Sequence, residues 1–136
     1  MKRFTLLVVL FALPVSLAFT ADKEKPAAKG DASYVHAVIF YLKKDAPKGE
    51  ADALVKDAFE LLAKIPSVRS IKAGLPAEKS SPKFAVTDYQ VGLLVLFDNY
   101  EGLKEYLEHP DHLKYVDRHM KHLDKILAYD FIDRKK

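Results

Sequence analysis

A short segment of the chain concentrates side chains that can move protons. Tyr106, His109 and His112 lie within seven residues, and Pro110 stands between the two histidines. A residue that precedes proline avoids the α region, so a helix that ends near Glu108 is expected to stop at His109. Proline then suits the first position of a new helix. The segment therefore predicts a helix, a tight break and a second helix, with Tyr106 and His112 facing one space between the elements. The alternative is that Tyr106 packs in the core and both histidines are helix-end residues without chemistry.

A further histidine lies in a segment with a strong strand pattern. Residues 34–42 are rich in valine, isoleucine and aromatic side chains, which is typical of a strand. His36 falls on the same face of this strand as Val38 and Phe40. A histidine buried on an apolar face needs a polar partner. His36 is therefore either a core histidine with its partner satisfied or part of a pocket, and Val38 would be its apolar neighbour there.

The N-terminus predicts export. Lys2 and Arg3 precede an apolar run that is followed by small residues, the pattern of a secretory signal peptide. We expect residues 1–18 to be removed, with cleavage after Ala18, or after Ala21 as the alternative. The apolar run is shorter than the about 20 residues that a membrane span needs. The mature protein is thus expected in an extracytoplasmic space, secreted or periplasmic, without membrane attachment. Residues 19–33 read as a flexible linker.

Charge and cysteine content exclude several classes of function. The formal net charge of +3 includes Lys2 and Arg3, and 3 − 2 leaves +1 for the mature chain. Acids and bases are interspersed without a basic stripe, which argues against a nucleic-acid partner. Residues 133–136 form a basic tail that is too short to count as a binding patch. The chain has no cysteine, so no disulfide framework or lipid-bearing cysteine is available.

Residues 34–132 have the length of one domain. Periodicity predicts strands at residues 34–42, 68–73, 89–97 and 126–132, and helices at residues 50–64, 99–108 and 110–123. The order β-α-β-β-α-α-β is that of an α+β, ferredoxin-like domain with its second helix split in two. Residues 93–97 are apolar on both faces, whereas helices cover only one face of such a sheet. A second copy is the simplest cover, so we expect a homodimer that forms a dimeric α/β barrel.

Two histidine pairs raise the question of a metal. His109 and His112, like His119 and His122, are three residues apart, a spacing that can share a metal. No third ligand lies near either pair, so we expect no metal site, and we expect His119 and His122 on the solvated helix surface. The chain has no glycine-rich phosphate loop, so we expect no cofactor. The last predicted helix has a polar stripe of His112, Tyr115, His119 and His122. Beside it runs an apolar stripe of Leu113, Val116, Met120 and Leu123.

Four segments, in this order, resemble the stress-responsive dimeric α/β-barrel family, also called the stress-response A/B barrel: residues 35–43, 65–74, 106–112 and 129–131. The resemblance implies a homodimer in which each protomer holds an apolar cavity between sheet and helices. A plant polyketide cyclase of this family closes a ring by aldol chemistry without metal or cofactor. The resemblance to it implies that Tyr106 and His112 are a catalytic pair and that His36 and His109 are pocket residues. Haem binding in other dimeric α/β-barrel proteins leaves a haem-ligand role for His119 open.

Two functions follow as hypotheses from different classes. In the first, the exported protein binds a small hydrophobic or carbonyl-containing molecule in an apolar pocket at His36, Val38 and His109. In the second, it is a cofactor-independent cyclase or lyase. His112 near a helix N-terminus would then be neutral and act as a base, and Tyr106 would donate to a developing enolate oxygen. Neither the ligand nor the choice between binding and catalysis follows from the sequence.

Overall fold

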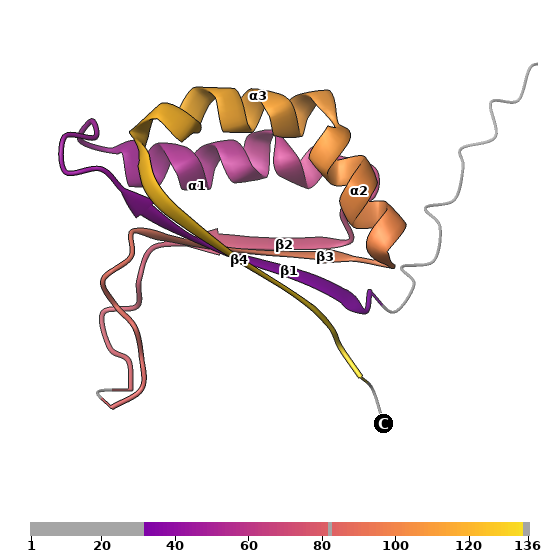
Figure 1. The fold of residues 1–136 in the computed structure, drawn as a ribbon, viewed down its shortest axis with the longest axis horizontal. Helices are drawn as coiled ribbons and strands as arrows, with labels where there is room; N and C mark the ends of the chain where they lie inside the picture. The colour runs from indigo at the N-terminus through magenta and orange to yellow at the C-terminus, as the bar shows by residue number, and fades with distance from the viewer. Residues whose placement is uncertain (1–31, 82, 135–136) are drawn as a thin grey trace, which may run out of the picture.

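A computed structural model describes residues 32–81 and 83–134 of the chain. The predicted signal peptide (1–18) and the predicted linker as far as residue 31 lie outside the described residues, as do the last two residues of the predicted tail. Within the described ranges the chain forms one antiparallel sheet and a helical layer (Figure 1). The strands are β1 (Tyr34–Leu42), β2 (Ser70–Gly74), β3 (Val91–Phe97) and β4 (Leu123–Ile132), and the α-helices are α1 (Glu50–Glu60), α2 (Tyr100–Glu108) and α3 (Pro110–His119).

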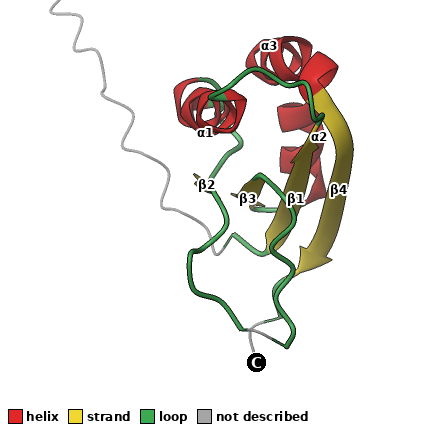
Figure 2. Cartoon of the chain, turned by 90° about the vertical axis from the view of Figure 1, so that its left-hand side faces the viewer, coloured by secondary structure: helices red, strands yellow, loops and turns green. Residues whose placement is uncertain are grey.

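The sheet has the strand order β2-β3-β1-β4, with every neighbouring pair antiparallel. All three helices lie on one face of it, and Figure 2 shows α1 and α3 side by side above the strands. The element order β-α-β-β-α-α-β and the α+β, ferredoxin-like fold are therefore as the sequence predicts. No helix among the described residues has the length and apolar character of a membrane span.

Several element ends differ from the sequence prediction. The first helix ends at Glu60 rather than residue 64, and a 3₁₀ turn over Leu62–Lys64 follows. Ile65 precedes Pro66 and is extended, which tightens the last turn before it. α3 ends at His119 rather than residue 123 and leads into a second 3₁₀ turn, Met120–His122. β4 begins at Leu123 rather than residue 126, because its pairing with β1 starts at Leu42.

β2 and β3 also begin later in the chain than predicted. β2 begins at Ser70 rather than residue 68, since the Val68 N–H bonds the Ile65 carbonyl in the turn after Pro66. β3 begins at Val91 rather than residue 89. At the start of β2, a local hydrogen bond of the connecting turn thus takes a residue whose side chain fits a strand.

The core lies between the helices and one face of the sheet. Along β3 every second residue is buried against the helices, namely Val91, Leu93, Val95 and Phe97. From the helical side Leu54, Ala58 and Leu62 fill the space above them and are fully buried. Burying one such side chain contributes about 1.5–3 kcal/mol, so this layer holds the helices to the sheet.

The opposite face of the sheet is apolar as well. No helix among the described residues covers it (Figure 1). Tyr129 and Phe131 of β4 are 56% and 53% exposed. Two hollows on this face, of about 340 and 290 Å³, are lined mainly by apolar side chains, among them Ile39, Tyr41, Leu94, Leu127 and Tyr129. This is the face that the predicted second copy would cover.

Two neighbouring substitutions on β3 separate folding from assembly. Val95→Asp places a charge in the helix-covered core, where Val95 is fully buried, and should unfold the chain. Leu94→Asp lies on the other face and should dissociate the dimer while leaving each protomer folded. Light scattering at micromolar concentration, with circular dichroism as the control for folding, measures both. A folded Leu94→Asp variant with the particle mass of the wild type would contradict dimerisation through this face.

Candidate functional site

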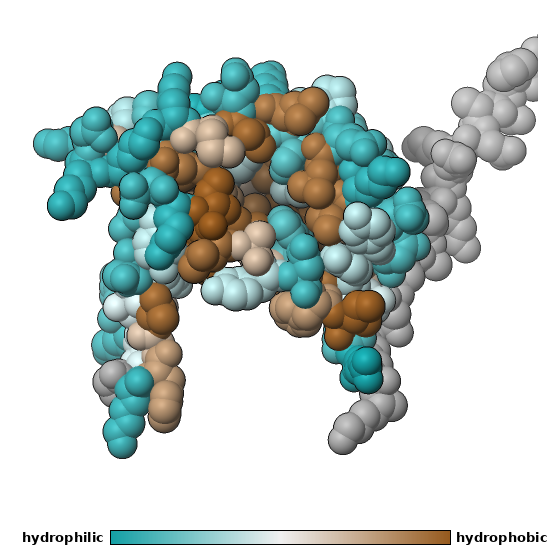
Figure 3. All heavy atoms as spheres, in the orientation of Figure 1, coloured by the Kyte–Doolittle hydropathy of each residue, from teal (hydrophilic) through white to brown (hydrophobic). Residues whose placement is uncertain are grey.

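A cavity of about 210 Å³ lies between the sheet and the second half of the helical layer. β1 and β4 form its floor, and α2 and α3 supply its roof. Figure 3 shows a hollow beneath α3 with hydrophobic side chains gathered around it. Its lining residues are His36, Val38, Phe40, Leu93, Tyr106, His112, Tyr115, Val116, Ile126 and Ala128. The walls are thus apolar, and two histidines and two tyrosines supply the polar groups.

The break between α2 and α3 brings two of these polar groups together. α2 begins after Asn99, whose side chain accepts a hydrogen bond from the Gly102 N–H (3.1 Å), and ends at Glu108. His109 is extended, and Pro110 opens α3. The ring centroids of Tyr106 and His112 are 4.5 Å apart as a result. The predicted helix, break and helix are confirmed, with both side chains facing one space.

His112 is held in one protonation state and one tautomer. Its Nδ1 lies 3.1 Å from the Leu107 carbonyl oxygen, which can only accept, so Nδ1 carries the proton. Burial lowers the pKa of His112, and the nearby His36 lowers it further, against the opposing effect of the Leu107 hydrogen bond. The ring is therefore neutral at pH 7, and Nε2 keeps its lone pair. That is the form a general base needs.

Tyr106 is the complementary donor. It is 1% exposed, and its ring packs against Phe97, His36 and His112. Burial raises the pKa of the Tyr106 phenol well above its ordinary value, so the hydroxyl stays protonated. Tyr115 is also buried, but its hydroxyl donates to the Leu54 carbonyl (3.3 Å). No such partner of the Tyr106 hydroxyl is found among the described residues, which leaves this donor available to a ligand.

His36 has the polar partner that its burial requires. Its Nδ1 lies 2.6 Å from an Asp130 carboxylate oxygen, and the two residues face each other in the β1–β4 register. The carboxylate accepts, so the His36 Nδ1–H donates and Nε2 remains unprotonated when the ring is neutral. The sequence analysis did not single out Asp130. Only the pairing of β1 with β4 places it opposite His36.

The structure brings four of the five predicted site residues together. His36, Val38, Tyr106 and His112 line the cavity. His109 does not. Its Nδ1 accepts a hydrogen bond from the Asp111 N–H (3.2 Å) and caps the N-terminus of α3. The pocket role predicted for His109 is therefore replaced by a structural one at the helix break.

The orientation of α3 differs from the predicted one. His119 is 4% exposed, so the expectation that it lies on the solvated surface is wrong. Leu113 and Met120 of the apolar stripe are instead 56% and 49% exposed. The reason lies on another helix, because α1 carries acidic partners for His119 that periodicity within α3 cannot reveal.

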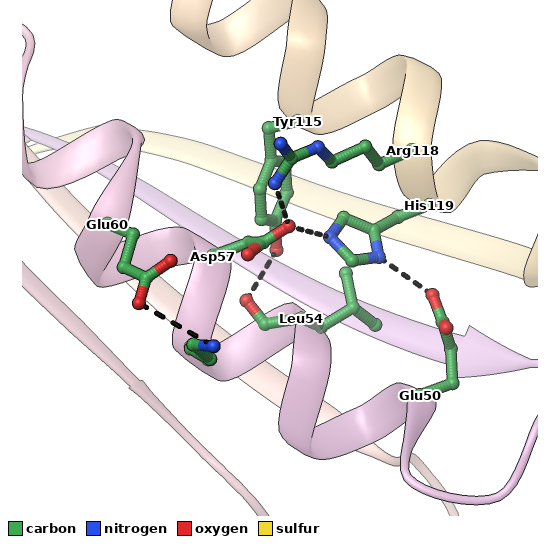
Figure 4. A network of polar contacts seen from close by, with 8 residues as sticks. Glu50, Leu54, Asp57, Glu60, Tyr115, Arg118 and His119 are labelled. Atoms are coloured by element: carbon green, nitrogen blue, oxygen red, sulfur yellow. Dashed lines mark hydrogen bonds and ion pairs between the residues drawn. The ribbon is translucent and has the colours of Figure 1, made fainter.

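The buried partners of His119 form a network between α1 and α3 (Figure 4). His119 Nδ1 is 2.7 Å from a Glu50 carboxylate oxygen, and Nε2 is 3.1 Å from Asp57. Arg118 donates to the same Asp57 oxygen at 2.8 Å. Because carboxylates only accept, His119 donates to Glu50 and Asp57 at the same time only when both of its ring nitrogens carry a proton. Burial opposes the ionisation of Asp57, but the hydrogen bonds from Arg118 and His119 outweigh it and lower the pKa of Asp57 overall. The network fixes α3, and with it the roof of the cavity.

Removing the centre of this network should destabilise the protein strongly. His119→Leu leaves the buried Glu50 carboxylate without its partner, and breaking a buried ion pair costs about 3–5 kcal/mol. Urea unfolding at pH 7 measures the loss in free energy of unfolding. His122→Leu, three residues on and only half-buried, is the matched control with a much smaller expected change. Equal effects of the two substitutions would mean that the network does not hold α3.

The fold and the cavity lead to a family. The family model described as "Stress responsive A/B Barrel Domain" matches residues 35–133 of the chain. The chain belongs to this family. Comparison with curated proteins gives no match.

Solved structures agree with this assignment at the level of the fold. A stress-responsive A/B barrel family protein from Mesorhizobium loti with a ferredoxin-like fold is 29% identical (TM-score 0.60), covering 75% of this chain and 97% of its own. A dimeric ferredoxin-like protein of unknown function from Bacteroides fragilis is 25% identical (TM-score 0.57), covering 76% and 98%. The hydroxynitrile lyase of Passiflora edulis is 15% identical (TM-score 0.64), covering 77% and 97%, and shows the likeness of the fold alone.

Proposed function

We propose that this stress-responsive A/B barrel protein binds a small apolar molecule that carries a carbonyl or hydroxyl oxygen. The observation that carries the proposal is the free Tyr106 hydroxyl beside the neutral His112 ring in an otherwise apolar cavity. The Tyr106 hydroxyl has no hydrogen-bond partner among the described residues and opens to the cavity, so a ligand oxygen placed there would accept from it. An apolar cavity with a few convergent polar groups is also the usual form of a small-molecule site.

A second candidate function is acid/base catalysis on the same ligand class. His112 Nε2 would take a proton from the carbon next to the carbonyl, and the electron pair of that C–H bond would form the enolate. Tyr106 would donate a hydrogen bond to its oxygen. His36, held by Asp130, is a further imidazole in the cavity. The hydroxynitrile lyase of Passiflora edulis supports a catalytic use of this fold, although fold likeness does not assign a reaction.

We also propose that the protein acts as a homodimer joined through the apolar sheet face. The exposed Tyr129 and Phe131 support it, as does the dimeric description of the Bacteroides fragilis protein. Neither candidate function needs a metal or cofactor in its scheme.

Substitutions at the Tyr106–His112 pair distinguish binding from catalysis. If the cavity only binds, Tyr106→Phe and His112→Ala should each weaken affinity by about 0.5–1.5 kcal/mol, the net value of a hydrogen bond. If it catalyses enolisation, turnover should fall about 10²–10⁴-fold with little change in binding. Small carbonyl and aromatic compounds are screened by thermal shift, and the hits are assayed for turnover. Tyr100→Phe and His122→Ala are matched controls outside the cavity.

The pH dependence of any turnover gives an independent reading of the base. The pKa of His112 is lowered, so the ring stays neutral to more acidic pH than an ordinary histidine. The midpoint of the acid limb of the pH–rate profile should therefore lie below the ordinary histidine pKa of about 6.5. This limb should be absent in His112→Ala. Binding that ignores both Tyr106→Phe and His112→Ala would place the ligand elsewhere.

Export remains a proposal from the N-terminal sequence. Lys2, Arg3 and the apolar run that follows support it. N-terminal sequencing of the protein from its source should begin at Phe19 or Asp22. A chain that retains Met1 would contradict it.

A further inference from the structure

An apolar strip on α3 and the 3₁₀ turn after it leads from the cavity to the surface. Leu113, Val116 and Met120 are spaced three and four residues apart, which places them on one side of the helical segment. Val116 lines the cavity, whereas Leu113 and Met120 are 56% and 49% exposed. The other flank of α3 carries Arg118, which bonds Asp57 on α1. The strip therefore faces away from α1, toward the β4 side of the molecule.

β4 continues this surface from below. Ile126 lines the cavity and is 38% exposed, so it belongs to both the interior and the outer surface. Figure 3 shows hydrophobic side chains gathered on both sides of the hollow beneath α3. We call Leu113, Val116, Met120 and Ile126 the apolar rim. The rim makes the apolar surface continuous from the cavity to the outside.

The size of the cavity shows why the rim matters. Pockets that enclose a drug-sized ligand hold about 300–1,000 Å³, and the cavity holds about 210 Å³. A ligand larger than a compact ring therefore extends past the cavity. Apolar side chains are exposed where the cavity opens between α3 and β4. A ligand that leaves the cavity there would remove their surface from water.

We propose that the ligand is amphiphilic, with its oxygen-bearing head at Tyr106 and His112 and an apolar tail that leaves between α3 and β4 over the apolar rim. This rests on the proposed function and names its ligand class as a lipophilic carbonyl or hydroxyl compound. The continuity of the rim with the cavity favours a tail of the bound ligand over a protein partner. Such a tail would also cover Leu113 and Met120, which α3 and the turn after it leave exposed.

A homologous series of 2-alkanones, from 2-butanone to 2-nonanone, tests the proposal by titration calorimetry of the full chain. Each methylene that reaches the rim should tighten binding about fourfold, the value of burying one CH₂. Leu113→Gln and Met120→Gln should reduce this increment toward one. They should leave the affinity for 2-butanone unchanged, because its chain is too short to reach Leu113 or Met120 outside the cavity. Phe59→Gln is the matched control, since Phe59 is an exposed apolar residue (46%) on α1 that does not line the cavity.

The outcomes separate this proposal from the proposed function. An affinity that stays constant with chain length but falls in Tyr106→Phe overturns the tail and leaves the binding site standing. An increment that survives Leu113→Gln and Met120→Gln places the tail elsewhere and also overturns it. A smaller particle for the rim variants by light scattering would identify the rim as a contact between copies. Binding that ignores Tyr106→Phe and His112→Ala, or no binding of any 2-alkanone, overturns the tail and the proposed site together.

Discussion

Proline at position 110 cannot donate the hydrogen bond that would continue α2, and it holds His109 extended. The remaining features of the site depend on this break. It ends α2 two residues after Tyr106 and starts α3 two residues before His112, so the two rings meet at 4.5 Å. It also gives His109 the geometry of an N-cap, so that the His109 ring accepts a hydrogen bond from the Asp111 backbone N–H. A continuous helix would carry Tyr106 and His112 apart along its axis.

The break sets where α3 begins, and the buried charges of α1 set which side of α3 faces the core. An amphipathic helix normally buries its apolar side. In α3 the buried side holds Tyr115 and His119, and the free energy that favours this comes from hydrogen bonds to Leu54, Glu50 and Asp57. The apolar residues on the other side of such a helix stay in contact with water unless another molecule covers them, and this contact costs free energy. Burial of Tyr115 and His119 on one side of the helical segment and exposure of Leu113 and Met120 on the other are thus two results of one arrangement.

Local signals in the sequence were sufficient for the fold and for the centre of the site. The β1 pattern, the Asn99 cap and the His109–Pro110 break each depend on residues that are neighbours in the chain. What the sequence could not predict depends on residues far apart in the chain. Asp130 meets His36 only through the β1–β4 register, and His119 meets Glu50 and Asp57 only because α1 packs beside α3. The start of β4 at Leu123 has the same origin, since the long β1 strand draws three more residues into the sheet.

The central claim is that a ligand oxygen completes the Tyr106–His112 pair. A crystal structure of the protein grown with acetophenone tests it most directly, because this ketone is compact and has a single oxygen. The account predicts acetophenone inside the cavity, with its carbonyl oxygen within about 2.5–3.0 Å of the Tyr106 hydroxyl and its ring against Val38 and Phe40. Acetophenone bound only on the open sheet face, or bound in the cavity with its oxygen turned away from Tyr106, would contradict it.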